Sequence, residues 1–282
     1  MRKSSLYLQR NSASILILAV WVLVFLSILA VALYKIIPAQ IILTGRVKDS
    51  ILSEYAAKSC LLLAMIDRSK AALPYDTLYE LRLKRKKEIG QAKCVYYIVD
   101  EDSKININTV SASVLARLPG LDMDLATAIT GSKLRPFKLK EELLLIEDIT
   151  PEIYDKIKDF ITVNSQGQVN INTAGPEVLS AIGFDDDLIE VIKEFRAGQE
   201  GIEGTQDGGI FQDPSTIIDN LRPLAGFSSS LEAELLQAIS QNMITVSSNN
   251  LCWHISVRVL NRPPTEVDVL FSENRIKQWR EH

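Results

Sequence analysis

The chain has 282 residues, of which 47% are hydrophobic and 23% are charged, and its formal net charge is −4. This length accommodates one large domain or two smaller ones, and the apolar fraction excludes an intrinsically disordered chain. The three cysteines, Cys60, Cys94 and Cys252, cannot all pair within one chain, which excludes a disulfide scaffold. Only two histidines occur, His254 and His282, so a histidine-rich metal cluster is excluded as well.

The charge is distributed unevenly along the chain. Residues 1–102 hold 15 Lys/Arg against 9 Asp/Glu, residues 103–248 hold 11 against 22, and residues 249–282 hold 5 against 4. The middle segment therefore has a net charge of −11 (11 − 22), which disfavours anionic ligands such as nucleic acid.

The first predicted element is the apolar stretch Ile15–Leu33, which has no charge and only Ser27 as a polar residue. As a helix it would be about 28 Å long, close to the thickness of the hydrocarbon core of a bilayer. Three basic residues and no acidic residue precede it: Arg2, Lys3 and Arg10. We therefore expect a cytoplasmic N-terminus, with the chain after Tyr34 on the other side of the membrane.

Three interpretations of this stretch remain open at this point. It is a single-pass anchor, a removed secretory signal, or a pilin-like segment behind a short basic leader. A secretory signal has a potential cleavage site at Ala30-Val-Ala32, but its apolar region would be too long. In the pilin-like interpretation the leader is removed between Asn11 and Ser12.

Helical periodicity continues beyond the apolar stretch. We expect one long helix with a membrane half and an amphipathic half, bent at Pro38 and ending before Pro74. Its apolar face comprises Leu43, Val47, Ile51, Tyr55, Leu62 and Ile66, flanked by Leu52, Ala56, Cys60 and Leu63.

A polar connection, Tyr75–Lys93, follows and contains the basic run Arg82-Leu-Lys-Arg-Lys-Lys87. A basic cluster of this kind can contact anionic lipid or nucleic acid, but we interpret this run as a solvated helix face. The next segment, Cys94–Val99, is rich in β-formers, and the acidic triplet Asp100-Glu-Asp102 ends it, which predicts a strand and its stop.

The chain then repeats itself at an interval of 64 residues. Asn106-Ile-Asn-Thr109 recurs as Asn170-Ile-Asn-Thr173, and each copy precedes a helix, a glycine turn and a second helix. This pattern is typical of helix-hairpin-helix motifs. The turns contain Gly120 with Asp122 and Gly183 with Asp185; Thr109 and Thr173 suit the caps of the first helices, and the two aspartates suit those of the second helices.

Each copy closes with a second, degenerate hairpin and a short β-rich segment. In the first copy Thr150-Pro-Glu152 is a strong helix start. The closing triplets, Ile161-Thr-Val163 and Ile244-Thr-Val246, are 83 positions apart, so the second copy is about 19 residues longer (83 − 64). The extra residues form a glycine-rich loop around Gly198–Asp213, and its acids could bind calcium or belong to a flexible acidic loop: Glu200, Glu203, Asp207 and Asp213.

After Asn250 the pattern changes to the alternation of β-strands. Leu251–Leu260 and Glu266–Phe271 predict a hairpin, followed by a short segment, Arg275–Trp279. The strand at Cys94 has no sequence-adjacent partner in this interpretation. We therefore expect it to pair with this hairpin across the helical insert.

No catalytic constellation is present in the sequence, which contains no GxGxxG, P-loop or CxxC motif. Nucleic-acid binding is the main alternative, because helix-hairpin-helix turns of the form G-h-G hold phosphate with backbone amides. Here Asp122 and Asp185 replace the second glycine, so the turns repel phosphate. We predict a protein that is neither an enzyme nor a nucleic-acid binder.

The order of these parts resembles minor pseudopilin K of type II secretion systems (general secretion pathway protein K) across nearly the whole chain. The resemblance rests on the Arg10–Leu16 junction before the apolar helix, the two Asn-Ile-Asn-Thr hairpins, Ile244-Thr-Val-Ser-Ser248 and Trp279-Arg-Glu281. It implies an α+β fold in which a pilin-like long N-terminal helix packs on a small antiparallel sheet. A large α-domain of tandem helix-hairpin-helix, SAM-like repeats is inserted in that sheet.

The resemblance also implies a location and a set of partners. The chain would be a single-pass protein of the bacterial inner membrane with its bulk in the periplasm, at the tip of the pseudopilus, initiating or capping its assembly. Its partners would be minor pseudopilins I and J, other pseudopilins and the prepilin peptidase. No cofactor is required; calcium occurs in the family, but its ligands do not map onto this sequence residue by residue. The runner-up is a membrane-anchored helix-hairpin-helix DNA receptor, as in competence systems.

Two features depart from the family pattern, namely Asn11 and the basic run Arg82–Lys87. Asn11 stands where the family has the glycine before the cleavage site, and Ser12 would be the mature N-terminus. Leu16 occupies the fifth mature position, where most pilins and pseudopilins have glutamate. If Cys94 and Cys252 lie on neighbouring strands of the pilin sheet, they are the expected disulfide pair and Cys60 is free.

The expected organisation has six segments: leader 1–11, transmembrane helix 12–34, pilin helix with linker and first strand 35–102, first repeat 103–165, second repeat 166–248 and C-terminal strands 249–282.

Overall fold

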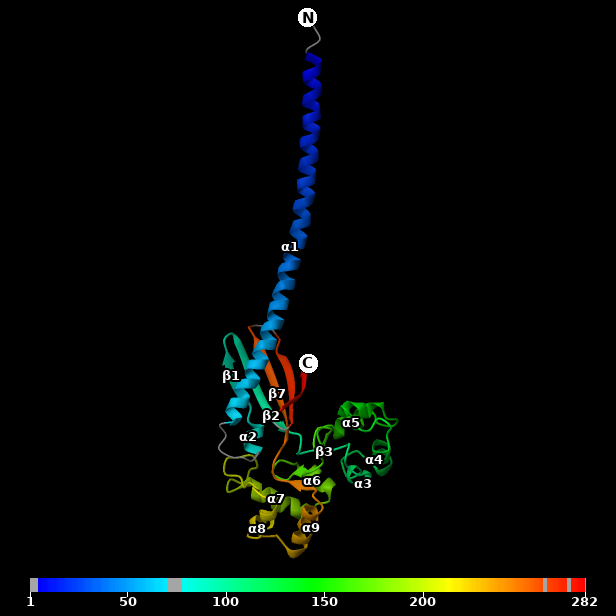
Figure 1. Cartoon of the computed structure of the whole chain (residues 1–282), viewed down its shortest axis with the longest axis vertical. Helices are drawn as coiled ribbons and strands as arrows, with labels where there is room; N and C mark the ends of the chain where they lie inside the picture. Colours follow the sequence, from blue (N-terminus) through cyan, green and yellow to red (C-terminus); the bar gives the residue numbers. More distant parts are fainter. Residues whose placement is uncertain (1–4, 70–77, 261–262, 273–274, 282) are drawn as a thin grey trace. The chain divides into compact units, whose positions relative to one another are not determined.

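The structure, a computed structural model, describes residues 5–69, 78–260, 263–272 and 275–281. The chain divides into two compact units, residues 1–55 and residues 56–282, which we describe separately. Figure 1 shows the elements of both units in chain order.

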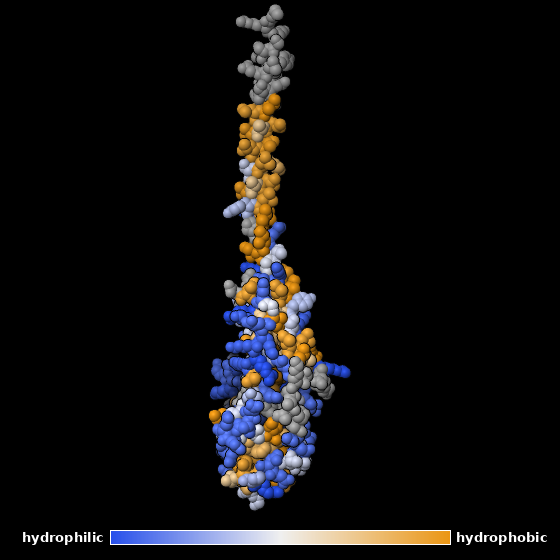
Figure 2. Space-filling model, turned by 90° about the vertical axis from the view of Figure 1, so that its left-hand side faces the viewer, coloured by the Kyte–Doolittle hydropathy of each residue, from blue (hydrophilic) through white to orange (hydrophobic). Residues whose placement is uncertain are grey.

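The first unit is formed by the N-terminal part of α1 (Ser5–Ser69), so the long predicted helix is confirmed. Its apolar side chains from Ile15 to Ile37 are exposed, and Figure 2 shows this segment coloured hydrophobic over most of the face in view. Among the described residues α1 is the one helix long and apolar enough to cross a membrane. The predicted end before Pro74 lies outside the described residues.

In the second unit α1 packs on the sheet through a different face from the one we predicted. Small residues dominate the buried side: Ala56, Ala57, Cys60, Leu61 and Ala64. Leu62 and Ile66, from the predicted apolar face, are 61% and 47% exposed. Small side chains let the helix approach the sheet closely, which explains why the flanking residues are buried in place of the larger ones.

The sheet of the second unit has five strands in the order β1-β2-β7-β8-β9, and all neighbours are antiparallel. Its strands are β1 (Arg85–Ile89), β2 (Ala92–Asp100), β7 (Asn250–Val259), β8 (Thr265–Ser272) and β9 (Arg275–Glu281). The pairing of β2 with β7 confirms that the strand at Cys94 joins the C-terminal hairpin across the helical insert.

We predicted that the basic run forms a solvated helix face, and this is wrong, because most of the run lies in the edge strand β1. The strand β2 therefore has a sequence-adjacent partner. The short helix α2 (Leu78–Arg82) precedes it. Alternate residues of β1 point to opposite faces, and Lys87 reaches Asp67 of α1 at 2.7 Å. Charged residues on an edge strand also prevent pairing with other chains, which gives the run a structural reason.

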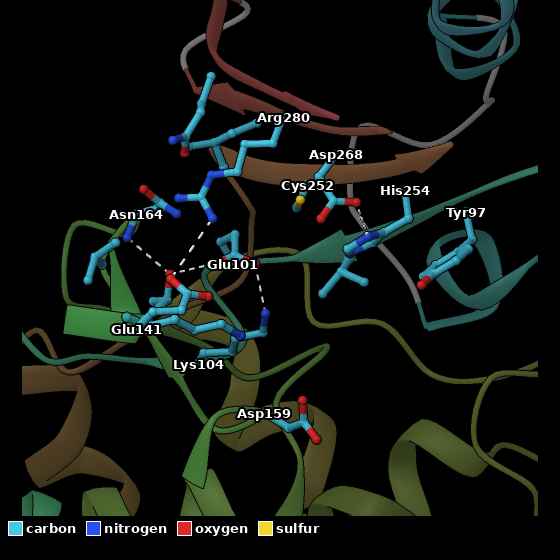
Figure 3. Close-up of a pocket in the computed structure, with 16 residues that line it drawn as sticks. Tyr97, Glu101, Lys104, Glu141, Asp159, Asn164, Cys252, His254, Asp268 and Arg280 are labelled. Carbon is cyan, nitrogen blue, oxygen red and sulfur yellow. Dashed lines mark hydrogen bonds and ion pairs between the residues drawn. The ribbon is translucent and has the colours of Figure 1, made fainter. Parts of the chain in front are cut away.

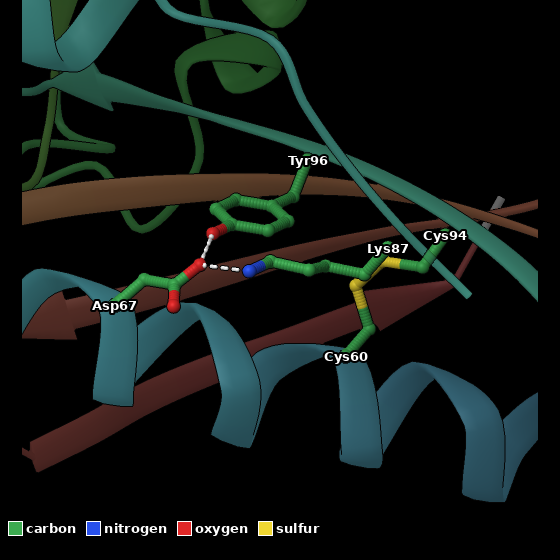
Figure 4. The surroundings of a disulfide bond; sticks show 5 residues. All are labelled: Cys60, Asp67, Lys87, Cys94 and Tyr96. Carbon is green, nitrogen blue, oxygen red and sulfur yellow. Dashed lines mark hydrogen bonds and ion pairs between the residues drawn. A yellow bond between two sulfur atoms is a disulfide. The ribbon is translucent and has the colours of Figure 1, made fainter. Parts of the chain in front are cut away.

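The disulfide joins Cys60 on α1 to Cys94 on β2, and Cys252 is free, so the predicted Cys94–Cys252 pair is wrong (Figure 4). β2 and β7 are neighbours, but Cys94 lies opposite Val257 and Cys252 lies opposite Val99. The two cysteines are thus on opposite faces of the sheet, because Cys94 is buried under α1 and Cys252 is half-buried on the outer face.

The inserted α-domain lies between β2 and β7 in the chain, and its two repeats share one hydrophobic core. The parallel pairs β3–β4 and β5–β6 close the two repeats. The first repeat contains β3 (Ile105–Asn106), α3 (Ala112–Leu115), α4 (Met123–Thr130), the 3-10 helix η1 (Lys140–Leu145), α5 (Pro151–Ile157) and β4 (Ile161–Thr162). The second contains β5 (Val169–Asn170), α6 (Pro176–Ile182), α7 (Asp186–Ala197), the 3-10 helix η2 (Pro214–Thr216), α8 (Ile217–Leu221), α9 (Ser229–Ser240) and β6 (Ile244–Thr245).

The residues that cap the helices are in part those that we predicted from the sequence. Asp122 caps α4 by accepting a hydrogen bond from the Leu125 N–H at 2.8 Å, and Thr150 caps α5 in the same way through Ile153, as predicted. Asp185 occupies the N-cap position of α7 without a side-chain cap bond. Thr109 and Thr173 are not caps, because Ser111 and Gly175 hold the N-cap positions of α3 and α6.

The asparagines of the repeated motif explain that difference. Asn106 Oδ1 and Asn170 Oδ1 accept hydrogen bonds from the N–H groups of Asn108 and Asn172, at 2.8 and 3.0 Å. These local bonds form Asx turns. Each motif therefore forms a turn, and two residues lie between the end of the motif and the first residue of its helix.

The second asparagine of each motif reveals where the longer copy gained its residues. Asn108 exchanges two hydrogen bonds with the backbone of Phe137, and Asn172 does the same with Phe211. The two phenylalanines are 74 positions apart, between the 64 of the motif and the 83 of the closing triplets. The insertion is thus divided into ten residues before Phe211 (74 − 64) and nine after it (83 − 74).

Candidate functional site: the junction of the sheet with the paired repeats

Three consecutive acidic residues at the end of β2 join the sheet to the α-domain. Asp100, Glu101 and Asp102 are 3%, 8% and 5% exposed. The sequence predicts that they end the strand; their burial shows that they have a further role. The signal in the sequence was three adjacent acids at the end of a buried strand, but their distant partners lie 61 to 148 residues away.

Asp100 ties the second repeat to the sheet. Its Oδ2 accepts hydrogen bonds from Thr173 Oγ1 at 2.5 Å, from Asn170 Nδ2 at 3.0 Å and from the Ser248 hydroxyl. Its Oδ1 accepts from the Asp102 N–H at 2.8 Å. This carboxylate therefore contacts both the start and the end of the second repeat.

Glu101 and Asp102 make the other attachments. Glu101 accepts from Lys104 Nζ at 2.7 Å and from the Thr162 hydroxyl, both in the first repeat. Asp102 accepts from the N–H groups of Asn249 and Asn250 at 2.7 and 3.0 Å, just where β7 begins. The three acids thus distribute their bonds over the two repeats and the returning strand.

Burial and neighbouring charge shift the pKa values of the three acids in different directions. Burial raises the pKa of Asp100 to about 6, against the hydrogen bonds from Ser248 and Thr173. Burial also raises the pKa of Asp102. Burial acts in the same direction on Glu101, but the charge and hydrogen bond of Lys104 outweigh it, so the pKa of Glu101 is lowered.

A cavity of about 450 Å³ lies beside Glu101, between the outer face of the sheet and the first repeat (Figure 3). On the sheet side Tyr97 stacks on His254, with ring centroids 4.8 Å apart, and His254 Nδ1 is 2.6 Å from Asp268 Oδ1. On the rim Arg280 of β9 faces Glu141 of the first repeat at 4.0 Å. The lining thus combines an aromatic stack with charges of both signs.

This cavity contains the free thiol, but the thiol is not activated. Burial raises the pKa of Cys252 to about 12, which keeps it protonated at neutral pH. Across the described part of the chain, no group of three or more His, Cys, Asp or Glu side chains could hold a metal ion. The geometry supports a binding or packing role for this site better than a catalytic one.

Both predicted hairpin turns contain a glycine with positive φ. Gly120 and Gly183 have φ of 92° and 113°, the left-handed region that favours glycine. A Cβ at Gly183 would lie 2.9 Å from Nη1 of Arg117, and that Nη1 donates to the Ala181 carbonyl at 3.4 Å. A Cβ at Gly120 would lie 3.1 Å from Cδ of Lys156. Side chains of the first repeat therefore cover both turn glycines.

The negative charge of the α-domain lies almost entirely in the second repeat. Residues 103–165 hold 8 Lys/Arg against 9 Asp/Glu, and residues 166–248 hold 3 against 13, a net of −10 (3 − 13). With Asp122 and Asp185 at the covered turns, this distribution disfavours a nucleic-acid interface.

The acidic loop of the second repeat uses its carboxylates in separate local bonds. Glu203 pairs with Arg196 at 2.7 Å, and Asp213 accepts from the Ser215 N–H at 2.8 Å. Asp207 accepts from the Thr205 hydroxyl at 2.7 Å and from the Glu200 N–H at 3.0 Å. Calcium binding by this loop stays a prediction.

The predicted leader site lies in α1, far from the junction in sequence. Asn11 and Ser12 belong to the helical backbone of α1, and the Leu16 side chain is 68% exposed. Cleavage and the role of Leu16 stay predictions.

Comparisons with known proteins bear on the fold. A family model for the helix-hairpin-helix motif matches residues 100–162, the first repeat. No curated protein sequence matches the chain. Among solved structures, a chain of the GspK–GspI–GspJ complex from the type 2 secretion system of enterotoxigenic Escherichia coli is similar, with a TM-score of 0.60 and 14% sequence identity. The match covers 85% of this chain and 99% of that chain. The chain therefore has an α+β pilin-like fold with a helix-hairpin-helix insert.

Proposed function

We propose that this protein is a minor pseudopilin of a bacterial type II secretion system, of the K type, anchored in the inner membrane with its bulk in the periplasm. The observation that carries the proposal is the insertion of two helix-hairpin-helix repeats between β2 and β7 of a pilin-like sheet. The likeness to a chain of the GspK–GspI–GspJ complex supports it. The protein acts by assembly and not as an enzyme.

The partners in this proposal are minor pseudopilins I and J, which would pack against α1. The side of α1 that faces away from the sheet exposes apolar residues in the second unit, among them Leu62 and Ile66. An exposed apolar face of a helix is typical of a helix-packing surface.

Co-purification tests this proposal. The full chain is co-expressed with minor pseudopilins I and J from the same genome and purified by a tag on the chain. We expect a stable complex that Leu62→Asp with Ile66→Asp abolishes. The matched control is Leu236→Asp on α9, because Leu236 is also half-exposed but lies in the second repeat. Absence of a complex, together with binding of duplex DNA, would favour the competence-like DNA receptor.

Processing by prepilin peptidase belongs to the same proposal. We expect removal of residues 1–11, so that Ser12 becomes the N-terminus, provided that the peptidase accepts Asn11. N-terminal sequencing of the membrane-extracted protein decides this, with Asn11→Gly as the positive control. An intact Met1 supports a simple anchor, and a start near Leu33 supports a secretory signal.

The most specific part of the proposal is a position at the tip of the pseudopilus, and Leu16 supports it. An unpaired carboxylate in hydrocarbon is costly, so glutamate is useful only where the N-terminal amine of the subunit ahead can pair with it. A tip subunit has no subunit ahead. We expect Leu16→Glu to leave assembly unchanged or weaker, and crosslinking of the wild-type chain at regular positions along the shaft would contradict the tip position.

A further inference from the structure

One end of the sheet, here called the entry end, is the end at which α1 enters the second unit. The disulfide places Cys60 over Cys94, and seven residues further along α1 the Asp67 carboxylate accepts from the Tyr96 hydroxyl at 2.7 Å. Moving back along α1 therefore leads toward the start of β2. The entry end consists of the β1–β2 turn at Gly90 and the end of β7 at Leu260, whose N–H bonds the Gln91 carbonyl at 3.4 Å.

Two cations lie directly opposite each other at this end. Lys93 of β2 pairs in register with Arg258 of β7, and both side chains are exposed. Like charges in this position destabilise a sheet. Glu88 lies opposite Lys93 on β1, but within the described chain no ion pair joins either cation to a carboxylate. The fold itself gives no reason for this pair.

Leu260, the next residue after β7, is unusual in two ways. Its side chain is 57% exposed, and its φ is 53°, in the left-handed region that bulky side chains disfavour. Backbone strain of this kind is concentrated at functional sites. An exposed leucine beside two unpaired cations fits a partner that is both apolar and anionic.

We propose that the entry end, through Lys93, Arg258 and Leu260, docks on the surface of the membrane and binds anionic lipid headgroups. The two cations would contact headgroup phosphates, and the Leu260 side chain would insert among the lipid acyl chains beneath the headgroups. The inference rests on the membrane span of α1 and goes beyond the proposed function. It concerns the subunit while it resides in the membrane.

The chain itself favours a lipid surface over an acidic protein. Twenty-two positions separate Tyr34, the last residue of the expected transmembrane segment 12–34, from Ala56, the first residue of the second unit. At the helical rise this tether is about 33 Å long. A tether of this length gives the entry end a high effective concentration with respect to the bilayer.

A polarity-sensitive fluorophore on Leu260→Cys, in a Cys252→Ser background, tests the proposal with the full chain in nanodiscs. We expect a blue shift in phosphatidylglycerol discs relative to phosphatidylcholine discs, reversed by high salt. Lys93→Gln with Arg258→Gln should lower the ratio of docked to undocked label roughly thirtyfold. The matched control, Lys133→Gln with Lys138→Gln, removes two exposed cations from the first repeat and should leave the shift unchanged.

Two results would overturn the proposal. One is the same emission in both kinds of disc, and the other is an undiminished shift in the Lys93→Gln, Arg258→Gln variant. A label at Leu236→Cys in the second repeat should not respond to the lipid. A Leu260 label that changes only when minor pseudopilins I and J are added would identify a protein surface and not a lipid surface. Because co-purification with I and J is measured separately, failure here leaves the proposed function untouched.

Discussion

Removing the Cys60–Cys94 disulfide should destabilise the second unit by an amount that follows from its loop length. The bond links residues 34 apart, one on α1 and one on β2. In the chain-entropy account, a loop of this length restricts the unfolded state by about 4 kcal/mol at 25 °C. For a unit of this size each kcal/mol lowers the melting temperature by about 2–4 °C, so we expect a loss of about 8–16 °C.

Thermal unfolding of the full chain in detergent measures this effect. Cys60→Ala with Cys94→Ala is compared with the wild type and with Cys252→Ala, which removes only the free thiol. Alanine is preferred to serine because both bonded cysteines are fully buried and a hydroxyl there would need a partner. Non-reducing mass mapping should find Cys60 linked to Cys94 and Cys252 open to alkylation. The reasoning fails if the double variant melts within about 3 °C of the wild type, or if Cys252 proves to be bonded.

Three further predictions concern the α-domain. Gly183→Ala should cost about 1–2 kcal/mol, because φ is 113° and the new Cβ would meet Arg117; Gly45→Ala, where a Cβ meets no atom within 4 Å, is the control in the same melting assay. Thr150→Ala should cost about 1 kcal/mol through loss of the cap of α5, and Thr150→Ser should restore most of it. The chain should not bind duplex DNA at physiological salt, even with Asp122→Gly and Asp185→Gly; salt-dependent micromolar binding in a fluorescence titration would contradict this.

Much of the fold could be predicted because its elements have strong local patterns. The apolar run of α1, the alternation in β7 and β8, and the Asn-Ile-Asn-Thr repeats each identify their element without tertiary information. β1 could not be found in this way, because five residues with four charges have no hydrophobic alternation. The edge position, which makes those charges favourable, is visible only once the sheet order is known.

At the disulfide and at the junction, the predictions failed because the contacts depend on how distant segments are placed against one another. Cys94 and Cys252 do lie on neighbouring strands, but the register places them on opposite faces. Asp100 likewise ends its strand as expected, yet its partner Ser248 is 148 residues away. A sequence shows which residues are acidic or apolar, but the partner of a buried group depends on packing between distant segments.

The raised pKa of Asp100 predicts that the folded state becomes less stable as the pH rises. In the unfolded chain the carboxyl titrates near 3.8, and in the folded chain near 6. Below pH 3.8 both states hold the proton, and stability is not reduced. As the pH rises toward 6 the unfolded state loses the proton first, so stability falls, by about 3 kcal/mol in total once the pH exceeds 6.

Asp100→Asn isolates this effect, because Asp102 and Glu101 titrate in both proteins. Between pH 7 and pH 3 the wild type should gain about 3 kcal/mol of unfolding free energy relative to Asp100→Asn, or about 6–12 °C in melting temperature. Parallel pH profiles would show that the hydrogen bonds from Thr173, Asn170 and Ser248 already compensate the buried charge. A gain in the opposite direction would mean that these donors hold the carboxylate more strongly than burial opposes it. The sign of this difference therefore decides whether burial or hydrogen bonding dominates where the second repeat joins the sheet.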